Sequence, residues 1–404
     1  METYKGIDEL RRKLAAKIPR ADLRYKYYEM KNVVKDLNIS TPPELKGWMG
    51  ALGWCGTAVD SIADRIVFRE FEHDVFGMNE IFAANNADVL FDSAVLGALI
   101  TSCDFIYITR DDEGFPLMRV IDGRHATGII DPTTYLLKEG YAVLSVDDYG
   151  RPMTEAYLVP GRTDIYEQGQ FVLSMAHEAP APLLVPVIYR PDAVRPFGHS
   201  HISRACMSHV QSAVRTAKRS EIAAEFFSFP QRYVLGMAPD AEQMDKWRVA
   251  MSALLRIDKD DDGDKPTVGQ FMQQSMSPHL DQLRMFAGLF AGETGLTLDD
   301  LGFPSANPTS SDAIKASHDS LRRKARKAQR TLGVGFKNAG YLAACVRDRQ
   351  TYFRKEVANT VLYWEPVFET DSAGLSGLGD AVNKIQQSFP GYFDEKKLHN
   401  LTGI

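Results

Sequence analysis

The first hundred residues are patterned mainly as helices. Apolar positions recur every three or four residues across residues 7–31, 52–66 and 79–100, which is the spacing of one helix face. Pro19 lies inside the first segment and predicts a break there, because proline removes a backbone donor and clashes with the preceding turn. We therefore expect three helical segments, the first of them interrupted.

The pattern changes to alternation after residue 102. Short runs with a period of two are separated by turns rich in Gly and Asp, as in antiparallel hairpins. These runs are residues 103–108, 117–121, 141–146, 154–159, 165–166 and 171–175. We expect them to form one antiparallel meander. The proline-rich residues 180–196 predict an extended connector that ends this part of the chain.

Long helical patterns return in the second half and enclose a small insert. Residues 200–227, 279–291 and 310–348 keep helical spacing, and Gly333 and Gly335 predict a kink in the last of these helices. The insert predicts a strand, a helix and a further strand that pairs with Ile257, at residues 232–235, 240–254 and 268–271.

The last part of the chain predicts little regular structure. Residues 357–368 have an extended pattern, the Gly-rich residues 371–379 predict a flexible linker, and residues 380–388 predict a short helix. The order of elements indicates an α+β fold with an elongated helical part.

Composition narrows the class of protein. The chain has 404 residues, of which 44% are hydrophobic and 25% charged, which favours a folded globular protein. A net charge of −6 does not suit a protein that grips nucleic acid, but it suits a surface that DNA passes without sticking. The longest apolar run, residues 94–100, is too short to span a bilayer, and residues 1–14 lack the apolar core of a signal peptide.

The cysteines give no sign of a metal or redox motif. They lie far apart and none belongs to a CxxC pair, which excludes a zinc ribbon and a thioredoxin-like site. We expect reduced, mostly buried thiols at Cys55, Cys103, Cys206 and Cys345.

Two clusters of residues have some of the ligands that a metal site needs. His199 and His201 flank Ser200, but no further ligand is placed by the spacing, so hydrogen bonding at a helix start is favoured over a metal. Residues 258–263 match the first half of a calcium-binding EF-hand loop, but the bidentate Glu at its end is replaced by Gly269. An acidic hairpin turn is favoured there, with a calcium site as the alternative.

Other catalytic motifs are missing. The sequence has neither a phosphate-binding GxxxxGK[ST] loop nor a GxGxxG after a strand, and Ser200 is not in a GxSxG elbow. We expect no enzyme activity and no cofactor.

A basic segment stands out within the long helix. Residues 312–330 contain seven Lys or Arg residues against two acids, which indicates either nucleic acid or an acidic partner, or else a solvated face packed against carboxylates of a neighbouring subunit. We favour the latter. Arg322, Arg326 and Arg330 share one helix face and are candidates for subunit contact.

Eight short motifs follow one another along the chain. They are YKYYEMK (25–31), AVDSIADR (58–65), HISRA (201–205), PQRYVLG (230–236) and, most specifically, KPTVGQF (265–271), PH (278–279), FAGETGL (290–296) and NPTSSDAI (307–314). This ordered set resembles the portal proteins of tailed phages, most closely those of actinobacterial phages and prophages. Each fragment is weak by itself, but together they cover nearly the whole chain in order.

The resemblance implies a division of the chain. It would comprise a wing (1–199) with a return strand (349–370), two stem helices (200–228 and 278–292), a clip (229–277), a tunnel-loop region (293–311), a long kinked helix (312–348) and a tail (371–404). Members of this family commonly continue into a helical crown, so the crown here is minimal or truncated.

The resemblance also implies a mechanical function. Portals form rings, usually of twelve subunits, at one capsid vertex, and serve DNA packaging and ejection. The implied partners are the terminase large subunit, head–tail adaptors, major capsid and scaffolding proteins, and double-stranded DNA, without a membrane. The implied location is the virion, with the host cytoplasm during assembly.

Site residues follow from the same analogy. The channel side would carry Asn307, Thr309, Ser310, Ser311 and Lys315. The clip would present Asp260, Asp261 and Asp262 to the terminase. Two other hypotheses remain open: another structural virion protein, such as an adaptor or a capsid-associated protein, and a metal-dependent nuclease that uses the acidic residues 258–264.

Overall fold

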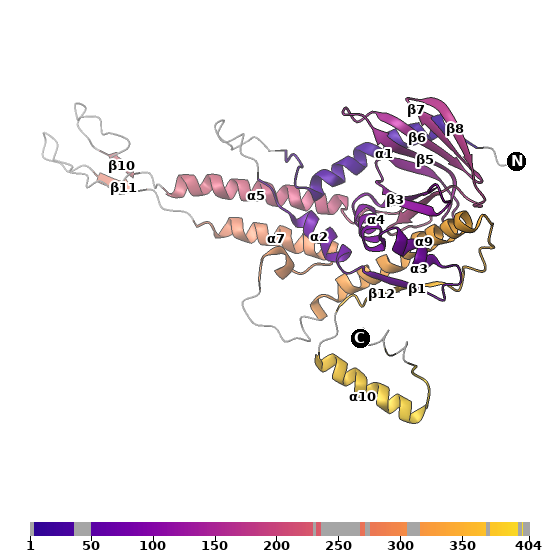
Figure 1. Cartoon of the computed structure of the whole chain (residues 1–404). Helices are drawn as coiled ribbons and strands as arrows, with labels where there is room; N and C mark the ends of the chain where they lie inside the picture. Colours follow the sequence, from indigo (N-terminus) through magenta and orange to yellow (C-terminus); the bar gives the residue numbers. More distant parts are fainter. Residues whose placement is uncertain are drawn as a thin grey trace, which may run out of the picture. The chain divides into compact units, whose positions relative to one another are not determined.

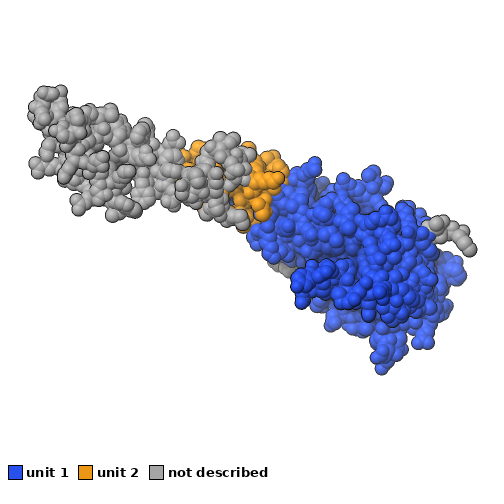
Figure 2. All heavy atoms as spheres, turned by 90° about the horizontal axis from the view of Figure 1, so that it is seen from above, with its two compact units in different colours: residues 1–32, 53–207, 291–404 blue, residues 33–52, 208–290 orange. Residues whose placement is uncertain are grey.

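The computed structural model (Figure 1) describes residues 4–35, 50–228, 232–235, 267–270, 275–304, 316–368, 372–394 and 398. Within them, helices and strands mix along the chain, in agreement with the expected fold class at that level. The chain divides into two compact units (Figure 2). Unit 1 comprises residues 1–32, 53–207 and 291–404, and unit 2 comprises residues 33–52 and 208–290.

The N-terminal helices are α1 (Ile7–Tyr28), α2 (Trp54–Ala63), α3 (Met78–Ala84) and α4 (Ala87–Thr101). The predicted break at Pro19 is wrong, because α1 continues through it. Buried side chains on both sides of the proline hold the helix, with Leu14 before it and Ala21 after it, and this packing outweighs one lost backbone hydrogen bond. The predicted helix over residues 79–100 is two helices, because Asn86 adopts a left-handed conformation with φ 52°.

The alternating runs form two sheets rather than one meander. The larger sheet has the order β4-β5-β6-β7-β8 and is antiparallel throughout. Its strands are β4 (Ala126–Ile130), β5 (Leu137–Val146), β6 (Pro152–Val159), β7 (Arg162–Glu167) and β8 (Gln170–Ala176). The sequence pattern missed β4.

The smaller sheet includes part of the proline-rich residues 180–196, which were predicted to form an extended connector. Its order is β3-β2-β9, with β2 (Cys103–Arg110), β3 (Pro116–Ile121) and β9 (Leu184–Ile188). The predicted connector 180–196 therefore contains a fully buried strand. Pro186 fits there because β9 is an outer strand of its sheet, where a residue without an N–H is tolerated.

Helix α1 covers the larger sheet. Leu10 and Leu14 form a buried cluster with Tyr141, Val143 and Tyr157. Burying a large apolar side chain stabilises a fold by roughly 1.5–3 kcal/mol. This cluster therefore fixes α1 on the sheet.

The long helix α9 (Asp319–Asp348) runs without interruption through Gly333 and Gly335. Its 30 residues place Phe336 in an aromatic cluster with Phe91 and Trp364. Trp364 belongs to β12 (Val361–Trp364), which pairs with β1 (Phe68–Glu72). Gly335 is required for close approach, since a Cβ there would lie 2.8 Å from the Pro186 carbonyl oxygen.

Unit 2 contains most of α5 (Arg204–Ser228) and α7 (Ser277–Thr294), together with β10 (Arg232–Leu235) and β11 (Thr267–Gln270). Thr216 Oγ1 donates to Gln282 Oε1 at 3.2 Å and links the two helices. Strand β11 pairs with β10. Residue 257 and the predicted helix 240–254 lie outside the described residues.

Two smaller elements complete the description. The predicted Gly-rich linker is wrong, because α10 (Ser372–Ser388) includes all three glycines of that stretch. The short 3-10 helix η2 (Asp299–Leu301) follows α7 within the predicted tunnel-loop region. In the part of the chain that the structure describes, no helix has the length and apolar character needed to cross a membrane.

Candidate functional site

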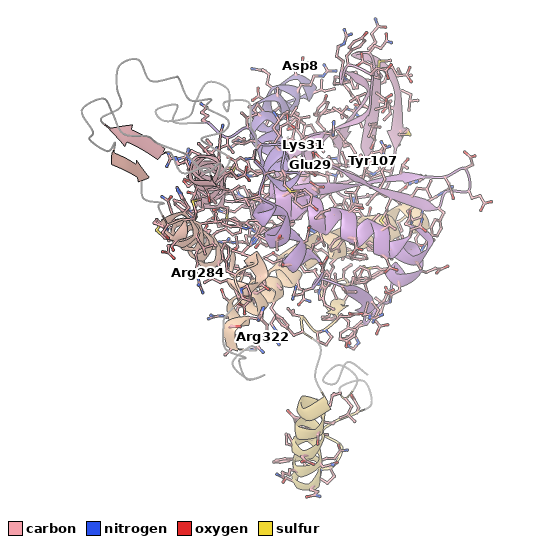
Figure 3. The ribbon with its side chains drawn as sticks, turned by 90° about the vertical axis from the view of Figure 1, so that its left-hand side faces the viewer. Asp8, Glu29, Lys31, Tyr107, Arg284 and Arg322 are labelled. Atoms are coloured by element: carbon pink, nitrogen blue, oxygen red, sulfur yellow. The ribbon has the colours of Figure 1, made fainter. Side chains whose placement is uncertain are left out.

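The first turns of α9 carry a basic surface, which we call the cationic face. Leu321, Ala325 and Ala328 are buried, and the positions between them are mostly exposed and basic. The cationic face consists of Arg322, Arg323, Arg326, Lys327 and Arg330. Figure 3 shows Arg322 near the start of the helix.

The charge of the cationic face is only partly compensated. Asp319 pairs with Arg322 at 3.3 Å and with Arg323 at 3.1 Å. Among the described residues, no carboxylate forms an ion pair with Arg326, Lys327 or Arg330. An excess of exposed positive charge of this kind attracts an acidic surface, whether nucleic acid phosphates or protein carboxylates.

Lys324 behaves differently from its neighbours on the same helix. Its Nζ donates to the Glu293 carbonyl oxygen at 2.5 Å, near the end of α7. Gly295, with φ 86°, leaves room for the lysine, since a Cβ there would lie 3.1 Å from Lys324 Cδ. Burial lowers the pKa of Lys324. The lysine thus ties the end of α7 to α9 and satisfies a helix-terminal carbonyl.

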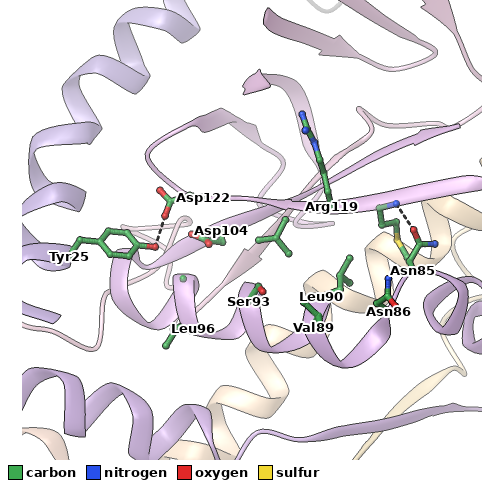
Figure 4. A pocket seen from close by; sticks show the side chains of 13 residues that line it. Tyr25, Asn85, Asn86, Val89, Leu90, Ser93, Leu96, Asp104, Arg119 and Asp122 are labelled. Atoms are coloured by element: carbon green, nitrogen blue, oxygen red, sulfur yellow. Dashed lines mark hydrogen bonds between the residues drawn. The ribbon is translucent and has the colours of Figure 1, made fainter. Parts of the chain in front are cut away.

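A second polar feature lies in unit 1, where a cavity of about 520 Å³ is bordered by α4 and β3 (Figure 4). Asp104, on β2, is 2% exposed and lines this cavity. Its Oδ1 accepts hydrogen bonds from the Gly123 amide at 2.9 Å and from Thr101 Oγ1 at 3.2 Å. Asp122 lies on the same cavity wall and accepts a hydrogen bond from the Tyr25 hydroxyl.

The pKa values of these two carboxyl groups are shifted in opposite directions. Burial raises the pKa of Asp104 to about 8, and the charge of Asp122 adds to this effect. Burial also acts to raise the pKa of Asp122, but hydrogen bonds from Arg124 and Tyr25 bring it below its usual range. Arg124 Nε lies 2.8 Å from Asp122 Oδ1, and its guanidinium stacks 3.9 Å from the centre of the Tyr25 ring. Asp104 therefore keeps its proton at neutral pH, whereas the neighbouring Asp122 is ionised.

Sequence reasoning missed this cluster. The available signal was an Asp inside an otherwise apolar strand, with Gly97 before it and Gly123 after it in the sequence. A Cβ at either glycine would collide with Asp104 or its neighbours. Such a signal requires knowledge of which elements meet.

His199, Ser200 and His201 each make hydrogen bonds of their own before α5 begins. His199 Nε2 lies 2.6 Å from Asp192 Oδ2, and buried His201 contacts the Tyr189 hydroxyl through Nδ1 at 3.3 Å. Burial lowers the pKa of His201 to about 3. Ser200 Oγ donates to the Ile100 carbonyl at 2.6 Å, which makes it a structural link. Over the described ranges, no group of three or more His, Cys, Asp or Glu side chains could hold a metal ion.

The remaining predicted residues have different outcomes. Arg322, Arg326 and Arg330 are exposed on one face of α9, four residues apart, as the pattern predicts. All the predicted channel and clip residues lie outside the described residues: Asn307, Thr309, Ser310, Ser311, Lys315, Asp260, Asp261 and Asp262. The four cysteines are buried and form no disulfide.

Comparison with known proteins finds two curated relatives, and both are named portal protein. The chain is 25% identical to the portal protein of Mycobacterium phage D29 over 338 residues, which cover 78% of this chain and 69% of the relative. It is 24% identical to the portal protein of Mycobacterium phage L5 over 340 residues, with the same coverage. No protein-family model matches the chain. The resemblance to portal proteins of actinobacterial phages is thus confirmed.

Among solved structures, the chain is similar to a protein of the neck of a native gene transfer agent particle. That similarity has a TM-score of 0.49 and 14% identity, and it covers 87% of this chain and 90% of the other.

Proposed function

We propose that this chain is a subunit of a phage portal, a ring at one capsid vertex through which double-stranded DNA enters and leaves the particle. One observation carries the proposal: the chain is similar to the portal proteins of phages D29 and L5 over 78% of its length. The action is mechanical, and ATP is hydrolysed by a separate terminase that docks on the ring.

The proposed ring subunit keeps the division expected from the resemblance. The wing comprises residues 1–199 and 349–370, the stem helices residues 200–228 and 278–292, and the clip residues 229–277. The order of elements in unit 2 supports this assignment, because α5 and α7 enclose the β10–β11 pair in the chain. Residues 293–311 form the tunnel-loop region, residues 312–348 the long helix, and residues 371–404 a tail or short crown.

The proposed partners follow the same division. The clip meets the terminase large subunit and later the head–tail adaptors, and Asp260, Asp261 and Asp262 are the contact residues. The wing meets major capsid and scaffolding proteins. Asn307, Thr309, Ser310, Ser311 and Lys315 face DNA, and a net charge of −6 supports passage without tight binding. The subunit assembles in the host cytoplasm and ends in the virion.

The cationic face of α9 has a role in this assembly. Arg322, Arg326 and Arg330 contact carboxylates of the neighbouring subunit. These side chains are exposed, and carboxylates among the described residues balance only part of their positive charge, which supports this contact. A ring contact is heterologous, so one face of each subunit meets a different face of the next.

Electron microscopy and native mass spectrometry of the purified chain test the proposal. We expect a closed ring with a central hole and a mass that is an integral multiple of 45.1 kDa. The measurement is repeated over a range of salt and protein concentrations, because charge-mediated contacts weaken in salt. A chain that stays monomeric under all these conditions contradicts the proposal.

A further inference from the structure

Strand β8 is an exposed apolar edge. It is the outermost strand of the five-stranded sheet and pairs only with β7. All seven of its residues are exposed, and none is charged. The exposed fractions of its large apolar side chains are 58% for Phe171, 47% for Val172, 43% for Leu173 and 38% for Met175.

Two other strand edges in unit 1 are closed by asparagine side chains. Asn79 accepts from the Phe71 amide at 2.8 Å and donates to the Phe71 carbonyl at 2.9 Å, which closes the edge of β1. Asn85 does the same on β3, where it accepts from the Met118 amide at 2.7 Å and donates to the Pro116 carbonyl at 3.0 Å.

The opposite edge of the β8 sheet is also closed. Lys13, on α1, donates to the Gly128 carbonyl of β4 at 2.6 Å. Within the described residues, the backbone of β8 has no hydrogen-bond partner outside β7. Of these four edges, β8 alone combines free backbone groups with an apolar surface, which is the combination that draws a further strand.

Three considerations favour a protein other than this chain as the occupant of this edge. In a ring each contact is heterologous, so a two-fold pairing of β8 with β8 of a second copy could not close the ring. A neighbouring copy offers no open edge at β1, β3 or β4, because side chains close all three. The absence of charge on β8 also selects against a charged segment, since a charge brought beside it would lose water without gaining a partner.

We propose that β8 is a docking edge for an extended, uncharged apolar segment of another protein of the particle, which adds as a sixth strand. Backbone hydrogen bonds hold the added strand, and its alternate side chains cover the two faces of β8. Leu173 and Met175 pair with Ile165 and Thr163 and lie on one face, whereas Phe171 pairs with Tyr166. This inference rests on the proposed portal function, because it requires an assembled particle.

Site-specific photo-crosslinking in assembled particles tests the inference. The full chain carries a photo-crosslinking amino acid in place of Phe171, or in place of Tyr149 as the control. Tyr149 is 82% exposed in the turn between β5 and β6. We expect the probe at position 171 to join a different polypeptide in particles and none in isolated rings. Mass spectrometry identifies the joined polypeptide.

The variant Leu173→Lys supplies a second measurement. A lysine in the edge strand places a charge where the added strand must lie. We expect the crosslink from position 171 to fall at least tenfold in this variant, while isolated rings form as before.

The outcomes separate the two proposals. A ring that is present in the particle but gives no crosslink from position 171, or only a crosslink to a copy of itself, overturns the β8 inference and leaves the portal function intact. An unchanged crosslink in Leu173→Lys overturns it as well. Absence of the chain from particles overturns both.

Discussion

The carboxyl group of Asp104 lies directly against the backbone of Gly97. A Cβ placed on Gly97 would come within 1.7 Å of Asp104 Oδ2. Helix α4 and strand β2 can therefore approach each other here only because position 97 has no side chain. The burial that raises the pKa of Asp104 depends on this approach.

Substitution Gly97→Ala is expected to destabilise unit 1. The added methyl group must displace a buried carboxyl, and such overpacking costs about 1–3 kcal/mol. Urea unfolding followed by circular dichroism measures the change. The matched control is Gly288→Ala, another helical glycine, where nothing lies within 4 Å of an added Cβ. The control should be neutral or slightly stabilising, and equal stability of the two variants would contradict the packing argument.

Stability should also depend on the protonation of Asp104. Folding raises its pKa from 3.8 to about 8, so the native state holds a proton that the unfolded chain releases. Its contribution is complete below about pH 4 and is lost as the pH rises toward 8. Asp122 and Lys17 also act on this carboxyl: the lowered pKa of Asp122 keeps it negatively charged across this window, whereas burial lowers the pKa of Lys17.

The variant Asp104→Asn cannot ionise and should lose this dependence. We expect it to be more stable than the parent chain at pH 8, by about 1–3 kcal/mol, because its folding requires neither the uptake of a proton nor the burial of a charge. Thermal unfolding between pH 5 and pH 8 measures the difference. Asp112→Asn, in an exposed turn, serves as the control and should follow the parent chain. Parallel pH profiles for Asp104→Asn and the parent chain would refute the assignment.

Replacing Lys324 should loosen the segment that follows α7. Lys324→Met removes the donor to the Glu293 carbonyl but keeps most of the apolar stem, so we expect a loss of about 1 kcal/mol. Hydrogen exchange of residues 293–304 should accelerate. Lys327→Met, on the exposed side of the same helix, should leave this exchange unchanged. If both variants exchange alike, Lys324 does not hold the segment.

Charge reversal on the cationic face should block assembly without unfolding the chain. Arg326→Glu changes an exposed side chain that has no ion pair among the described residues, so its effect on stability should stay within about 0.5 kcal/mol. In the ring it would face carboxylates of the neighbouring subunit. We expect native mass spectrometry to show monomers or short arcs.

The control for this substitution is Arg12→Glu on α1, whose side chain is 77% exposed and forms an ion pair with Glu9 at 2.9 Å. It should assemble like the parent chain. If Arg326→Glu forms normal rings, the proposal that the cationic face makes a subunit contact is wrong.

The sequence predicted those parts of the fold whose residues signal locally. Apolar spacing located α5, α7 and α9, because apolar residues recur every three or four positions along each of them. Two predictions based on proline were wrong. Pro19 lies within a helix and Pro186 within a strand, because the packing around each residue outweighs its tendency to interrupt regular structure. The sequence did not predict the cluster around Asp104, nor the hydrogen bonds from Asn79 and Asn85 to the outer backbone of β1 and β3. In each case the partners come from different elements of the chain.

The uninterrupted course of α9 has a mechanical consequence. A helix of 30 residues is about 45 Å long and resists bending better than a pair of shorter helices joined by a hinge. Arg322 stands near one end of it, and at the other end Arg347 Nη2 donates to the Phe76 carbonyl at 2.7 Å. One continuous helix therefore connects the cationic face with the loop before α3 inside unit 1, so the distance between these two parts of the molecule is fixed by the helix itself.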